Sequence, residues 1–94
     1  MNMLSQFKTT DEIAVREVGV ISKMLGDLVR TVQLIESDIA AEEERTRISD
    51  RSDGKYPILA RTLIERRDNL KVTVAALERR LTERAQHEQV PTAA

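Results

Sequence analysis

Residues with catalytic or metal-binding chemistry are few in this chain of 94 amino acids. His87 is the single histidine, cysteine is absent, and no HExxH-like or Cys-based ligand spacing occurs, which excludes the common zinc and iron–sulfur sites. No serine stands in a GxSxG elbow, and no glycine-rich phosphate loop is present. We therefore predict no catalytic residue, no metal site and no cofactor, and we do not expect an enzyme.

Charged residues make up 33% of the chain and supply the remaining candidates. Glu42, Glu43 and Glu44 form an acidic cluster with Asp50 and Asp53, but the spacing is not that of a calcium loop, so a hydrated surface is the simpler interpretation. A basic cluster could contact phosphates: Arg61, Arg66, Lys71, Arg79, Arg80 and Arg84. Acidic residues interleave with these cations and no aromatic residue lies among them to stack on bases, which favours a solvated helical face.

Two long helices are expected to position these residues. Apolar residues recur at alternating steps of three and four in the first half of the chain, the a/d pattern of a helical seam. These seam residues are Val18, Ile21, Leu25, Leu28, Val32, Ile35 and Ile39. Residues 9–12 have capping-box spacing, so we predict a helix over about 10–47. In the second half, Leu63, Leu70 and Leu77 repeat every seven residues after Pro57, which suits a first helical position, and they predict a helix over about 57–88.

The turn-forming residues 49–57 lie between the two predicted helices. A connection of about nine residues between helices of similar length favours an antiparallel hairpin. The charges agree, because residues 1–54 carry seven Lys/Arg against eleven Asp/Glu (−4) and residues 55–94 carry eight against five (+3). The predicted fold class is all-α: one helical-hairpin domain over residues 1–94, with flexible tails at 1–8 and 89–94.

Polar and small residues interrupt the two apolar patterns. If residues whose numbers sum to about 104 face each other, Arg67 lies near Glu36. The two could form an ion pair that fixes the register, or the stem of Arg67 could cover apolar surface while its head reaches water, which is the simpler interpretation. Gly19 and Gly26, one heptad apart, could form a flat strip for another helix or be tolerated in a helix stabilised by packing.

Apolar residues outnumber the positions that one hairpin can bury. Met24 and Val29 lie off the first seam, as do Ile13, Val15, Val20 and Leu34. An exposed apolar patch is typical of an interaction surface, and small scaffolds with this deficit commonly oligomerise. We expect a homodimer in which two hairpins form a four-helix bundle, or a complex with a different protein.

The predicted function is that of a non-enzymatic protein–protein interaction module: a small adaptor, regulator or chaperone-like protein. The expected interaction surface comprises the seam of the first helix together with Met24, Val29, Leu63, Leu70 and Leu77. The alternative is a small nucleic-acid-associated regulator that uses the basic cluster. No signal peptide or membrane-length apolar run is visible, so the expected location is the cytoplasm, and the excess of arginine over lysine (eleven to four) is typical of GC-rich bacterial genomes.

Overall fold

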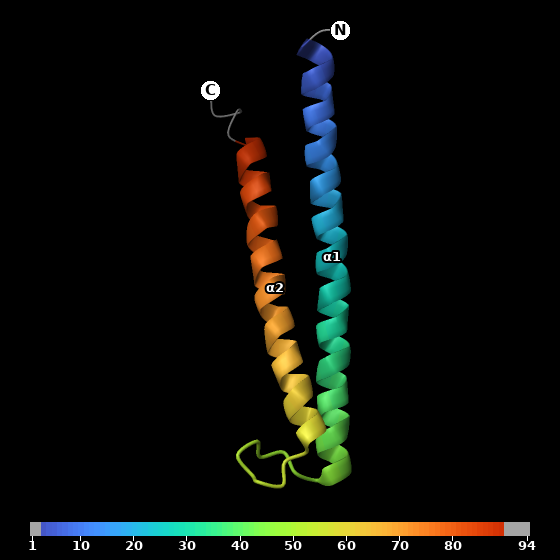
Figure 1. The fold of residues 1–94 in the computed structure, drawn as a ribbon, viewed down its shortest axis with the longest axis vertical. Helices are drawn as coiled ribbons and strands as arrows, with labels where there is room; N and C mark the ends of the chain where they lie inside the picture. The colour runs from blue at the N-terminus through green and yellow to red at the C-terminus, as the bar shows by residue number, and fades with distance from the viewer. Residues whose placement is uncertain (1–2, 90–94) are drawn as a thin grey trace.

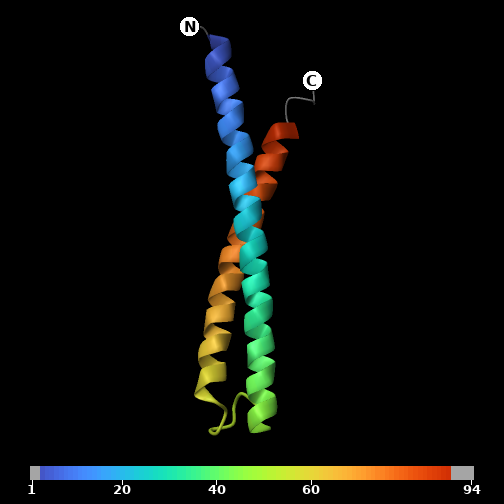
Figure 2. The ribbon, with the colours of Figure 1, turned by 90° about the vertical axis from the view of Figure 1, so that its right-hand side faces the viewer.

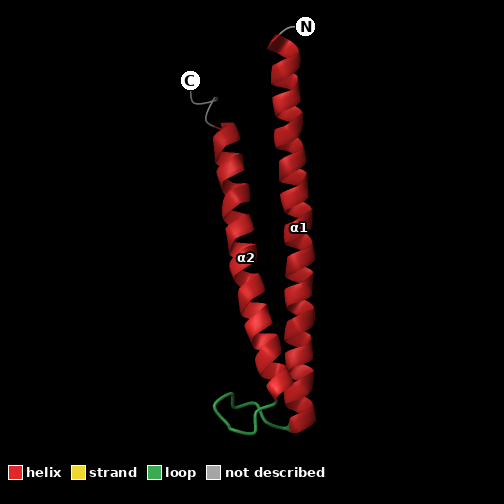
Figure 3. Cartoon of the chain, viewed as in Figure 1, coloured by secondary structure: helices red, strands yellow, loops and turns green. Residues whose placement is uncertain are grey.

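Two antiparallel helices joined by one loop make up the fold (Figures 1 and 3). The computed structural model describes the backbone of residues 3–89, with side chains at residue 12 and from 14 to 86. Helix α1 spans Met3–Thr46, helix α2 spans Ile58–Gln89, and within the described residues no strand occurs. Viewed from the side, the helices cross at a shallow angle along their length (Figure 2). The all-α hairpin prediction is confirmed.

The first helix begins earlier than the sequence pattern predicts. The predicted start at residue 10 is wrong, because α1 begins at Met3, so residues 9–12 lie inside the helix and not at its start. Residues 3–9 contain no glycine or proline, so nothing in the chain interrupts the helix before the capping-box pattern. Residues 3–8, assigned above to a tail, therefore belong to α1. The second helix matches its prediction to within one residue, and residues 90–94 of the other predicted tail lie outside the described chain.

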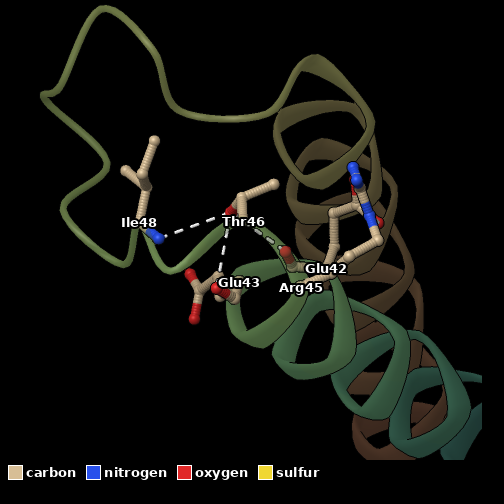
Figure 4. Close-up of polar contacts among 5 residues, drawn as sticks. All are labelled: Glu42, Glu43, Arg45, Thr46 and Ile48. Carbon is tan, nitrogen blue, oxygen red and sulfur yellow. Dashed lines mark hydrogen bonds and ion pairs between the residues drawn. The ribbon is translucent and has the colours of Figure 1, made fainter.

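Helix α1 ends at a left-handed residue. Arg47 has a φ of 60°, the conformation that commonly terminates a helix. The hydroxyl of Thr46 donates to the carbonyl of Glu42 at 3.0 Å and lies 3.4 Å from that of Glu43, while the amide of Ile48 donates to the same hydroxyl (Figure 4). The Thr46 hydroxyl thus bonds back to carbonyls of the preceding turn, as threonine hydroxyls in helices commonly do, and accepts from the first amide beyond Arg47.

The loop between the helices is built from aspartate turns. The Asp50 carboxylate accepts hydrogen bonds from the amide of Ser52 at 3.0 Å and from its hydroxyl at 2.7 Å. The Asp53 carboxylate accepts from the amide of Lys55 at 2.8 Å, and its carbonyl accepts from the amide of Tyr56 at 3.0 Å. Such side-chain turns set the backbone locally, which leads the chain into α2 in a defined conformation.

Burial is concentrated along the facing sides of the helices and near the loop. Among the described residues, the buried apolar side chains are Ile21, Val32, Ile35, Ile39, Tyr56 and Ala60. The molecule measures 67 × 27 × 15 Å, so its thinnest dimension is close to the diameter of one helix with side chains. The hairpin is therefore a single layer of helices without a second layer over either face, whereas most domains pack two layers around a core.

A candidate protein-interaction face

The predicted seam of α1 forms the interface within the hairpin. Ile21, Val32, Ile35 and Ile39 are buried, and Val18, Leu25 and Leu28 are half-buried. On α2, Leu63, Leu70 and Leu77 are half-buried. While the hairpin is closed, the buried part of the seam cannot contact another protein, so the surface open to a partner consists of the residues beside it and the outer flanks of the half-buried leucines.

Two faces flank the seam, one on each side of the plane that contains both helices. In an α-helix, the residue before a seam position and the residue after it project to opposite sides, about 100° away in each direction. We call the side formed by the preceding residues the Glu17 face. On α1 its members are Glu17, Val20, Met24, Asp27, Thr31, Leu34 and Asp38. We call the other side the Glu36 face. On α1 its members include Val15, Ser22, Val29, Gln33 and Glu36.

Ion pairs between the helices show which α2 residues belong to the Glu17 face. The carboxylate of Glu17 accepts from Nε of Arg80 at 3.0 Å and from Nη2 of Arg84 at 2.6 Å. Steps of three, four and seven residues back from these arginines keep to the same side of α2. By the rule used for α1, the α2 residues on this side are Leu59, Thr62, Arg66, Asn69, Thr73, Ala76, Arg80 and Glu83, and the seam residues Leu70 and Leu77 border them.

The Glu17 face is rich in uncovered apolar side chains. Val20 is 58% exposed, Met24 47% and Leu34 67% on α1, while Leu59 is 56% exposed on α2. The half-buried Leu70 and Leu77 lie between these two rows. Together they make an apolar strip that extends over both helices, the kind of surface that marks an interaction site.

The Glu36 face is more polar at its centre. Lys71 pairs with Glu36 across it, with Nζ and Oε2 3.7 Å apart. Beside this pair is a groove of about 250 Å³, lined by Val29, Val32, Gln33, Glu36, Lys71 and Val74. Val15 and Val29 are the large exposed apolar residues that α1 contributes on this side. An ion pair and a glutamine occupy the centre of this face, whereas the Glu17 face has four large exposed apolar side chains among its polar residues.

The Glu17 carboxylate is held in its ionised form. Its pKa is lowered because Arg80, the stronger influence, and Arg84 both donate hydrogen bonds to it. The three side chains lie toward the end of the hairpin away from the loop, and they join residues 63 and 67 positions apart in the chain. They therefore link the helices where few apolar side chains are buried.

Arg67 and Glu36, the predicted register pair, each take another partner. Arg67 donates to the carboxylate of its neighbour Asp68 from Nε at 3.1 Å and Nη2 at 3.0 Å, with its side chain 16% exposed. Glu36 pairs with Lys71, four residues beyond the expected arginine. The residue numbers of this facing pair sum to 107, not to the assumed 104. Helix α2 is therefore shifted along α1 by almost one helical turn from the expected position. Arg67 thus covers the seam with its stem while its head lies at the edge.

Most members of the predicted basic cluster have partners within the chain. Arg61 lies over the ring of Tyr56, 5.3 Å from its centroid, and donates to the carbonyl of Asp53 at 3.1 Å. Lys71, Arg80 and Arg84 pair with glutamates as described above. Arg66 and Arg79 are exposed, on different sides of α2. The cluster does not form a single row of cations.

A buried contact at the loop was not predicted from the sequence. Tyr56 is 3% exposed, and its hydroxyl donates to Oε2 of Glu43 at 2.6 Å. The pKa of Tyr56 is raised, mainly by burial and next by the Glu43 carboxylate. Glu43 was interpreted above as part of a hydrated acidic cluster, but it is half-buried, and its neighbour Glu42 accepts from Arg45 at 3.2 Å. In the sequence, the one indication of this buried contact was an isolated tyrosine in an otherwise polar loop.

The described side chains contain no group of three or more histidines, cysteines or acidic residues placed to hold a metal ion. His87 lies outside them. Neither helix, over its described length, is long and apolar enough to cross a membrane. No protein-family model, curated protein or solved structure matches this chain.

Proposed function

We propose that this protein is a non-enzymatic protein–protein interaction module, a small adaptor, regulator or chaperone-like protein that acts through an apolar helical face. The observation that carries the proposal is the set of exposed apolar side chains beside a seam that one hairpin only partly buries. We also propose that the chain forms a homodimer whose two hairpins make a four-helix bundle. The proposal places the protein in the cytoplasm, where a chain without cysteine folds without disulfides.

The accessible surface supports association. The chain exposes 7509 Å², whereas a compact monomer of 10.7 kDa exposes about 5,500 Å² by the usual scaling with mass. The difference of about 2,000 Å² exceeds the ~800 Å² that each partner buries in a standard interface. The radius of gyration of 20.6 Å compares with about 12 Å for a compact domain of this length. Covering one face with a partner would bring the burial closer to that of an ordinary domain.

The nucleic-acid alternative has less support. Phosphate binding needs cations that are available on one surface, and Lys71, Arg80 and Arg84 already neutralise glutamates of the same chain. Arg61 stacks on Tyr56. The protein-interaction proposal uses residues that have no such partners to give up, since apolar side chains gain by being covered.

Photo-crosslinking in the native cell tests the proposed function. A photoreactive amino acid replaces Met24 on the Glu17 face, and in a control it replaces Ser37, which is exposed on the outer side of α1. We expect a protein adduct from position 24 and little from position 37. An absence of protein adducts at position 24, or equal adducts at both positions, would refute the proposal.

A further inference from the structure

We infer that the Glu17 face is covered by a second copy of this chain, with both loops at the same end, so that α1 of each copy packs on α2 of the other. This inference rests on the proposed function and specifies its partner, its surface and its orientation. The four helices then form a bundle in which every neighbouring pair is antiparallel, the arrangement of many short-loop bundles.

Apolar content selects the face. The Glu17 face offers Val20, Met24 and Leu34 on α1 opposite the half-buried Leu70 and Leu77 on α2. A second hairpin laid on this face would bury all five side chains. On the Glu36 face, the same position would place the Lys71–Glu36 pair and Gln33 in the centre of the interface, where desolvating charges is costly.

Charge selects the orientation. From residue 17 to residue 38, the charged residues that α1 contributes to the Glu17 face are acidic: Glu17, Asp27 and Asp38. The charged residues that α2 contributes are mostly basic: Arg66, Arg80 and Arg84, with Glu83 as one acid near the far end. A twofold axis across the helices, which puts the loops at opposite ends, would set α1 against α1 and acid against acid. A twofold axis parallel to the helices sets α1 against α2 of the other copy and acid against base.

The register of the hairpin identifies the facing charges. A twofold axis parallel to the helices keeps each residue at its own height in both copies. Within one hairpin, Glu36 lies level with Lys71 and Glu43 lies level with Tyr56. Toward the loop, Asp38 lies two residues from Glu36 and Arg66 lies five residues from Lys71. At 1.5 Å per residue the two are within about 5 Å of the same height, which an arginine side chain can span. In the dimer, Asp38 of each copy thus faces Arg66 of the other, which gives two equivalent ion pairs.

Light scattering on the purified chain tests the face. The wild type is expected at about 21 kDa, twice 10.7 kDa. Val20→Asp is expected to convert it to a monomer, whereas the control Val15→Asp changes the same residue type at similar exposure on the Glu36 face (67% against 58%) and is expected to stay dimeric. Circular dichroism verifies that both variants remain helical. A dimeric Val20→Asp variant would overturn the inference.

Charge exchange tests the ion pairs. Asp38→Arg and Arg66→Asp alone are each expected to weaken the dimer, raising its Kd by about tenfold, because each replaces two attractions with two repulsions. The double variant Asp38→Arg/Arg66→Asp is expected to restore the Kd to within about threefold of the wild type. A double variant weaker than either single variant contradicts this pairing.

Cysteine cross-linking tests the orientation, since the natural chain has no cysteine. With Ser52→Cys in the loop, a short bis-maleimide is expected to link the two copies at low protein concentration. A mixture of Ser52→Cys and Gln86→Cys chains is expected to give no mixed product, because these positions lie at opposite ends of a 67 Å molecule. A mixed product would show loops at opposite ends and overturn the inference.

Failure of this inference is distinguishable from failure of the proposed function. A wild-type chain that is a folded monomer of 10.7 kDa would exclude the second copy. If position 24 still gave an adduct with a different protein in the cell, the interaction function would stand. If position 24 gave no adduct, both proposals would fall.

Discussion

Replacing Ile39 with alanine should destabilise the hairpin by about 2 kcal/mol. Ile39 is 4% exposed, and alanine removes three carbon atoms worth about 0.8 kcal/mol each, or about 2.4 kcal/mol in all. The better helix propensity of alanine returns about 0.4 kcal/mol. The cavity adds little, because a hairpin one helix thick can close around the lost side chain.

The chain offers a control with the same chemical change. Ile58 is 81% exposed at the start of α2, so Ile58→Ala uncovers only about a fifth as much buried surface, and its cost of about 0.5 kcal/mol is nearly cancelled by helix propensity. Neither residue belongs to the Glu17 face, so both comparisons are independent of the second copy. Urea unfolding followed by circular dichroism at equal protein concentrations measures both free energies.

The expected difference of about 2 kcal/mol corresponds to about thirtyfold in the folding equilibrium constant. If Ile39→Ala cost no more than Ile58→Ala, the seam would not be the stabilising interface of the hairpin. The assignment of buried and exposed sides to α1 would then be wrong as well.

Four further outcomes are expected. Burial raises the pKa of Tyr56, so its ionisation opposes folding; the melting temperature should fall as pH rises above about 10, and Tyr56→Phe should remove part of that fall. The pKa of Glu17 is lowered, so its ionised form stabilises the fold above pH ~4.5, and this stabilisation is lost as the pH falls through the folded-state pKa. In a plot of melting temperature against pH, Glu17→Gln should therefore show a smaller fall at acid pH than the wild type. Gly19→Ala should stabilise α1 by up to about 1 kcal/mol in urea titrations, since an added methyl meets nothing within 4 Å; weakened assembly would instead indicate a close helix contact there. Arg67→Leu should leave the mass by light scattering unchanged, because its head already lies at the seam edge with Asp68.

Periodicity was enough to predict the two helices and the buried seam. The steps of three and four between Val18 and Ile39 depend only on which side of one helix faces the other, so they could be interpreted without coordinates. The end of α2 was predicted to within one residue. The start of α1 was predicted wrongly because a capping-box pattern marks a helix start only if the chain before it is not helical. Residues 3–9 contain no glycine or proline that would prevent a helix there.

Contacts that depend on how the helices lie against each other were beyond the sequence. The residue numbers of facing pairs were assumed to sum to 104, three less than the observed 107. For this reason Arg67 was predicted as the partner of Glu36, whereas the structure has Lys71. The contact between Tyr56 and Glu43 depends on the path of the loop, which several aspartate turns determine together. The exposed apolar residues were recognised, but their division into two faces needed the Glu17 ion pairs to identify which side of α2 joins which side of α1.

The position of the buried tyrosine has a consequence for the order in which the chain folds. Tyr56 and Glu43 are 13 residues apart, whereas Arg84 and Glu17 are 67 apart. Closing the longer loop first costs about 1.5 kcal/mol more in chain entropy, so the contact near the turn is the favoured starting point. From there each further pair of facing residues closes a gap already shortened by the last, and the hairpin assembles from the turn outward, with the Glu17 ion pairs among the last contacts to form and the first to open.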